Sequence, residues 1–144
     1  MLLDFEDSPA AFSWTGPIAH EVLERWLARQ ADRSIPADLI TLWRTVGGGD
    51  LFESETILEP FASPSADDID GMNEHLRSRG MPSNLLAFHV GICVSAVDQA
   101  SGVLVQLDPE SLGEQARFST FDGWYRTLIR SEYAERYGLA DEGR

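Results

Sequence analysis

Apolar residues recur three and four positions apart in four stretches of the chain, a pattern typical of helices that bury one face. The predicted helices cover residues 17–29, 36–46, 66–79 and 120–137. Pro17 and Pro36 suit the first turn of a helix, where a missing N–H costs nothing. Gly47-Gly48-Gly49 ends the second helix. Three glycines in a row also predict a sharp turn or a close approach to another segment.

Short apolar runs predict strands between and after these helices. We expect two short strands within residues 50–61 and further strands at 85–88, 92–97, 103–108 and 117–118. Residues 98–102 end in glycine and suit a hairpin connection. Residues 1–16 are predicted to be an irregular or short-strand lead-in, and residues 139–144 a frayed C-terminus.

The chain has 144 residues, the size of one domain, and a formal net charge of -13 from 24 acidic residues and 11 basic ones, all arginine. This charge argues against binding to nucleic acid, which needs cations that displace phosphate counterions. The sequence has no long apolar run or basic leader, and its single cysteine, Cys93, cannot form an internal disulfide. We therefore expect a cytoplasmic protein without membrane contact. The charge serves solubility, or it speeds association with a basic partner.

Asp67, Asp68 and Asp70, followed by Gly71, suggest a calcium loop, but the spacing fails. The first ligand of such a loop would fall at Ala66, and its closing glutamate would fall at an arginine. Acids at the start of a helix are the simpler interpretation, because they complement the helix dipole.

No group of residues predicts catalysis, a metal or a cofactor. His20, His75 and His89 lie on different predicted elements, with no two at ligand spacing. Cys93 could pair with a distant histidine as a nucleophile, but its apolar neighbours favour a small buried side chain. The glycines at 47–49 lack the later Gly-Lys-Ser/Thr of a phosphate loop.

The acid-rich middle of the chain is the candidate partner-binding site. Seven acids and no arginine lie within residues 50–70, namely Asp50, Glu53, Glu55, Glu59, Asp67, Asp68 and Asp70. Such acids form either a solvated face or a patch that binds a basic surface.

Three segments carry a family resemblance. The first is Ile35-Pro36-Ala37-Asp38-Leu39, which runs into Leu42-Trp43 and ends at the three glycines. The second is the predicted hairpin strand Val103-Leu104-Val105-Gln106-Leu107-Asp108, and the third is Phe118-Ser119-Thr120-Phe121-Asp122-Gly123-Trp124. Together with the order of elements over residues 17–138, they resemble the SUKH superfamily of bacterial toxin-immunity proteins and relatives of a fungal cell-wall-assembly regulator.

The resemblance implies a single α+β domain over residues 17–138, with helices packed on a mainly antiparallel curved sheet. It also implies no enzymatic activity, because members of the immunity branch bind a cognate toxin and block it. Many such toxins are nucleases with basic surfaces, which an acidic protein would attract. We therefore predict an immunity-type toxin inhibitor that needs no cofactor. A general protein-interaction or scaffold module is the alternative, and an enzyme built on Cys93 and a histidine is the third hypothesis.

Overall fold

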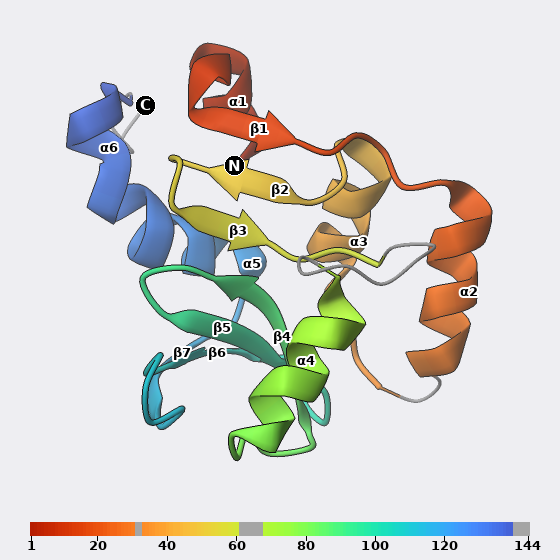
Figure 1. The fold of residues 1–144 in the computed structure, drawn as a ribbon. Coiled ribbons are helices and arrows are strands. Elements are labelled where there is room, and N and C mark those ends of the chain that lie inside the picture. The colour runs from red at the N-terminus through yellow and green to blue at the C-terminus, as the bar shows by residue number, and fades with distance from the viewer. Residues whose placement is uncertain (31–32, 61–67, 140–144) are drawn as a thin grey trace.

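The fold is built on a seven-stranded sheet in which each strand pairs with the next one along the chain (Figure 1). This computed structural model describes residues 1–30, 33–60 and 68–139. The strands are β1 (Phe12–Trp14), β2 (Gly49–Leu51), β3 (Glu55–Ile57), β4 (Leu85–Val90), β5 (Val94–Asp98), β6 (Leu104–Leu107) and β7 (Glu114–Phe118). All six pairings are antiparallel, which confirms the predicted α+β fold.

Helices lie at two connections between strands, before the first strand and after the last one along the chain. They are α1 (Leu2–Asp7), the 3-10 turn η1 (Pro9–Ala11), α2 (His20–Gln30), α3 (Ala37–Thr45), α4 (Ile69–Ser78), α5 (Phe121–Trp124), the π-helical η2 (Tyr125–Arg130) and α6 (Ser131–Tyr137). The four predicted helices are thus present. The first begins at His20 and not at Pro17, and the N–H of Ile18 donates instead to the carbonyl of Trp43, 3.0 Å away.

The central strands are buried on both faces, because helices cover both sides of the sheet. Alternate side chains of a strand point to opposite sides and so enter two different cores. In β4, Leu86 and Phe88 belong to the larger hydrophobic core, whereas Leu85 and Ala87 belong to a second one. The second core is closed by Leu76 of α4. Figure 1 shows α4 in front of the sheet and α3 and α5 behind it. A polar side chain that points inward from these strands must therefore find its hydrogen bonds inside the protein.

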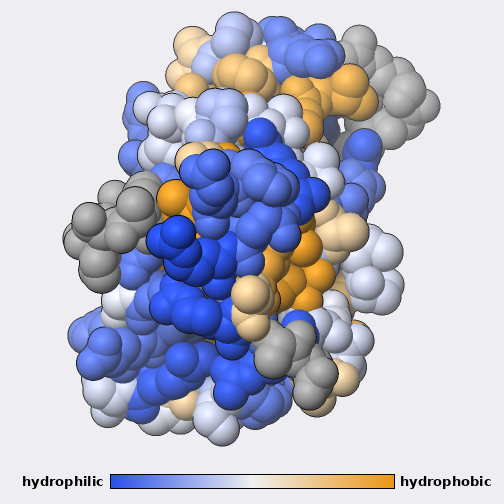
Figure 2. All heavy atoms as spheres, turned by 90° about the vertical axis from the view of Figure 1, so that its right-hand side faces the viewer, coloured by the Kyte–Doolittle hydropathy of each residue, from blue (hydrophilic) through white to orange (hydrophobic). Residues whose placement is uncertain are grey.

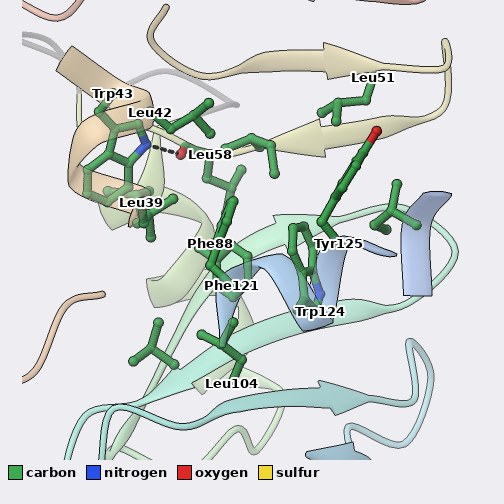
Figure 3. Close-up of a cluster of buried hydrophobic side chains, with 14 of the residues drawn as sticks. Leu39, Leu42, Trp43, Leu51, Leu58, Phe88, Leu104, Phe121, Trp124 and Tyr125 are labelled. Carbon is green, nitrogen blue, oxygen red and sulfur yellow. Dashed lines mark hydrogen bonds between the residues drawn. The ribbon is translucent and has the colours of Figure 1, made fainter. Parts of the chain in front are cut away.

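Three tryptophans fill the larger core. Trp26, Trp43 and Trp124 are 2%, 0% and 0% exposed. The indole N–H of Trp43 donates to the carbonyl of Leu58 at 2.9 Å (Figure 3). The ring centroid of Trp124 lies 4.8 Å from that of Phe88, in an edge-to-face arrangement. Trp124 is thus a core residue.

The glycines after α3 pass close to two neighbouring strands. A Cβ atom on Gly47 would collide with the carbonyl oxygen of Gly16, and one on Gly49 with that of Ser13. Gly47 also has a φ of 80°, in the region that only glycine adopts at little cost. The predicted close approach is thus confirmed, and it allows β2 to follow α3 directly and pair with β1.

The first residues of the chain pack on the sheet, and the short strand expected within residues 1–16 is present as β1. Strand β1 forms the edge of the sheet. Asp4 of α1 is 8% exposed and accepts hydrogen bonds from the Tyr125 hydroxyl at 2.6 Å and from Arg130 Nε at 2.9 Å. Burial raises the pKa of Asp4, but these two donors outweigh it and hold the pKa below its usual value. The buried ion pair therefore joins α1 to η2.

We expect Asp4→Asn to lower the free energy of unfolding by about 3 kcal/mol, because it leaves the buried guanidinium of Arg130 without its carboxylate. Urea denaturation measures this loss as a lower midpoint. Glu6→Gln is the matched control, since Glu6 lies on the same helix and is exposed. Equal midpoints for the two variants would show that the ion pair does not hold α1.

Candidate functional site

Three of the seven predicted site residues point into the protein and do not belong to a surface patch. Glu55, Glu59 and Asp68 are 1%, 2% and 2% exposed. Each carboxylate accepts hydrogen bonds from the protein itself, as a buried charge requires. The partner-binding role predicted for these three residues is therefore wrong.

Glu59 and Asp68 hold local backbone structure. Glu59 accepts from the Gly48 N–H and from the Thr15 hydroxyl, both at 2.6 Å, so it ties the glycine turn to the segment after β1. Asp68 is the N-cap of α4, and its side chain accepts from the Gly71 N–H at 3.0 Å. The interpretation of this acid as the start of a helix is confirmed.

Asp50, Glu53 and Asp70 are exposed, whereas Asp67 lies outside the described residues. Asp70 pairs with Arg29 at 3.2 Å and accepts from the indole N–H of Trp26 at 3.0 Å. Figure 1 shows the β2–β3 turn at the opposite end of the hairpin from the start of α4. The exposed acids therefore do not form one patch: Asp50 and Glu53 lie on the hairpin, and Asp70 lies on α4.

The surface around α2 is strongly hydrophilic. Figure 2 faces this helix and shows hydrophilic residues over most of the view. Hydrophobic residues gather at the upper end of the molecule, which Figure 1 shows to carry α1 and β1, and in a second patch to the right of centre in Figure 2. Among the described residues, exposed carboxylates outnumber exposed arginines.

A buried line of polar side chains crosses the sheet beneath Trp124. His89 Nε2 lies 2.8 Å from Glu55 Oε1, and His89 Nδ1 lies 2.9 Å from Ser95 Oγ. Ser95 Oγ accepts the indole N–H of Trp124 at 2.9 Å. The other oxygen of Glu55 accepts from the Tyr133 hydroxyl at 2.7 Å. The line therefore connects β3, β4, β5, α5 and α6.

Burial and the hydrogen bonds within this line determine the protonation states of His89 and Glu55. Burial lowers the pKa of His89, and the partial opposing effect of Glu55 does not restore it. Burial raises the pKa of Glu55, but hydrogen bonds from His89, Tyr133 and the Ile92 N–H bring it below its usual value. A neutral His89 that donates from Nε2 to an ionised Glu55 satisfies both ring nitrogens, because Ser95 then donates to Nδ1.

The Ser95, His89 and Glu55 side chains have the residue types of a hydrolytic triad but not its accessibility. Ser95 and His89 are both 0% exposed. A serine nucleophile must reach its substrate, whereas Ser95 Oγ is surrounded by His89 and Trp124. The geometry therefore favours a structural role for this line.

Cys93 has the environment of a buried thiol. It is 2% exposed, and its Sγ lies 3.7 Å from Ser95 Oγ. Burial raises the pKa of the thiol, which opposes formation of the thiolate that a nucleophile needs. Within residues 1–30, 33–60 and 68–139, no three His, Cys, Asp or Glu side chains converge as metal ligands.

A groove of about 680 Å³ opens between α1, α3 and the start of the C-terminal helices. This volume is typical of ligand sites. Its apolar lining includes Leu2, Leu3, Leu42 and Phe121, and its charged lining is Asp4, Asp7, Asp38, Asp122, Arg126 and Arg130. Figure 3 shows Leu42 on α3, and Phe121 and Tyr125 on the α5–η2 segment.

The groove was missed in the sequence because three distant segments build it. The adjacent Leu2 and Leu3 in an otherwise acidic N-terminal stretch are the one available signal. Leu3 is 69% exposed, unusually high for a large apolar residue.

Comparisons with known proteins support the fold. No family model matches the chain, and no curated protein matches it. A crystal structure of a protein from Pseudomonas syringae pv. tomato is similar, with a TM-score of 0.63 and 14% identity. The likeness covers 89% of this chain and 97% of that one. At this identity, it shows a shared α+β fold. Among the described residues, no helix is long and apolar enough to cross a membrane.

From the buried position of His89 beside Glu55, we predict that the protein loses stability on mild acidification. The unfolded chain takes up a proton as the pH falls through about 6.5, the ordinary pKa of histidine, whereas folded His89 has a lowered pKa and resists. The unfolded state then binds more protons, so the unfolding free energy falls by at most about 1.4 kcal/mol per pH unit. Glu55 adds to this loss only below about pH 4.5, its ordinary pKa.

Urea denaturation between pH 8 and pH 5 measures this effect. We expect His89→Gln to be less stable than the wild type at pH 8 but to lose less stability between pH 6.5 and pH 5. His75→Gln, a change of an exposed histidine on α4, should keep the wild-type slope. A His89→Gln protein with the full slope would contradict a neutral buried His89.

Proposed function

We propose that this chain is a cytoplasmic immunity-type protein that captures and neutralises a basic protein toxin without chemical reaction of its own. The observation that supports this proposal is that the carboxylates of the protein fall into two groups, one buried and one exposed. The inward-pointing ones are used by the fold, whereas the exposed ones leave the surface negative. The resemblance of residues 17–138 to the SUKH superfamily supports the same role.

The electrostatic reason is simple. A toxin that cleaves nucleic acid must present cations to phosphate groups, and an acidic protein competes for those cations. Exposed carboxylates also attract a basic partner from a distance and raise the association rate. Asp50 and Glu53 on the β2–β3 hairpin suit this role because both are exposed.

Coexpression with a toxin encoded beside this gene tests the proposal. We expect restored growth and a stable complex of the two proteins. A toxin that remains free and lethal would refute the proposed function. Restored growth without a complex would also contradict it, because the proposal requires direct binding.

Charge reversal tests the role of the hairpin. Asp50→Lys with Glu53→Lys should lower the association rate with the toxin by about tenfold at low salt, and the difference should shrink at high salt. Stopped-flow kinetics measures both rates. Glu110→Lys with Glu132→Lys is the matched control, since it changes the net charge equally at exposed sites elsewhere. Equal rates for the two double variants would place the contact elsewhere, and rates independent of salt would favour a general scaffold module.

A further inference from the structure

The groove between α1, α3 and η2 offers apolar surface that stays exposed within residues 1–30, 33–60 and 68–139. Leu3 and Ile92 are the exposed large hydrophobic residues of the part that the structure describes, and Leu3, at 69%, is the more exposed. Leu3 lies at the groove, whereas Ile92 lies on the β4–β5 turn. Phe121 and Leu42 supply further apolar lining. An exposed apolar site with a polar rim is typical of a binding surface.

The charges around this apolar surface favour a cation. Arg130 is bound to Asp4, and Arg126 pairs with Asp122 at 2.9 Å. Both guanidiniums of the lining therefore already contact carboxylates. Asp38 is exposed at the start of α3, and its carboxylate makes no hydrogen bond or ion pair within residues 1–30, 33–60 and 68–139. The lining carries four aspartates against two arginines, so the groove is negative and would repel an anionic ligand.

The walls of the groove are held in place before anything binds. The bonds from Tyr125 and Arg130 to Asp4 fix α1 against η2. Helix α3 is fixed on the core by Leu39, Leu42 and Trp43, whose side chains are 0%, 3% and 0% exposed. A preformed groove lowers the entropic cost of binding.

We propose that this groove binds a basic amphipathic segment of a protein partner. An apolar side chain of the segment packs against Leu3 and Phe121, and flanking lysines or arginines face Asp38 and Asp7. Grooves between helices commonly bind amphipathic segments in this way. The inference deepens the proposed function, because it assigns the basic toxin a second contact besides the β2–β3 hairpin.

A synthetic amphipathic peptide of leucine and lysine, with leucines at i and i+4, tests the groove without any toxin. We expect a dissociation constant of about 10 μM by fluorescence anisotropy at low salt. Thr41→Arg places a cation on the exposed groove residue Thr41 and should weaken binding at least about tenfold. Leu3→Ser should weaken it by a similar factor, and a leucine–glutamate peptide should not bind.

Ile92→Ser is the matched control, because it removes the other exposed large hydrophobic residue and leaves the groove unchanged. It should bind the peptide like the wild type. Circular dichroism checks that all three variants remain folded. The inference is overturned if the lysine peptide fails to bind at 1 mM, binds Thr41→Arg equally, or is matched by the glutamate peptide. A dimer that Leu3→Ser abolishes would also overturn it, since a second copy would then occupy the groove.

Binding measurements with the toxin distinguish a failure of this inference from a failure of the proposed function. If the toxin binds the wild type, Thr41→Arg should raise its dissociation rate about tenfold while Ile92→Ser leaves the rate unchanged. A toxin that binds both variants equally overturns the groove as its contact and leaves the immunity role standing. A lysine peptide that binds the groove when no toxin is neutralised supports the groove and refutes the immunity role.

Discussion

Burial of the central sheet on both faces is the constraint on which the rest of the structure depends. Helix α4 closes one face, and α3 with the C-terminal helices closes the other. A polar residue that points inward from β3 or β4 then has no access to water. Its hydrogen bonds must come from other elements. This condition explains why Glu55, His89 and Ser95 form a continuous line and why Trp124 and Tyr133 complete it.

Because of the same burial, the acidic residues form two groups: buried acids that stabilise the fold and exposed acids on the surface. Glu59 holds the glycine turn, Asp68 caps α4, and Asp4 joins α1 to η2. These acids are buried and accept hydrogen bonds inside the protein, so they cannot contact the side chains of a partner. The exposed acids can contact a partner directly, and they contribute to the long-range attraction of the molecule for cations. Net charge alone therefore overstates the binding surface, because it counts both groups together.

The hairpin acids and the groove would act at different stages of binding. Exposed charges mainly affect the association rate, whereas a buried apolar contact mainly affects the dissociation rate. Asp50 and Glu53 can attract a basic partner before contact. The groove beside Leu3 can then hold it, because burial of apolar surface is favourable only at contact range. In the proposed function, the hairpin acids would thus speed association, and the groove would slow dissociation.

The sequence by itself determined most of the fold. Local signals placed the four longer helical stretches, most of the strands and the glycine turn, because periodicity, capping residues and glycine conformations act within a few residues of one another. The sequence could not tell Glu55, which is buried, from Glu53, which is exposed, since both belong to the same acidic run. Only the tertiary structure decided that difference, because the burial of each side chain depends on which other elements pack over it. It also brought Leu3, Asp38 and Asp122 to one groove. Contacts between such distant segments leave no pattern in any short stretch of the chain.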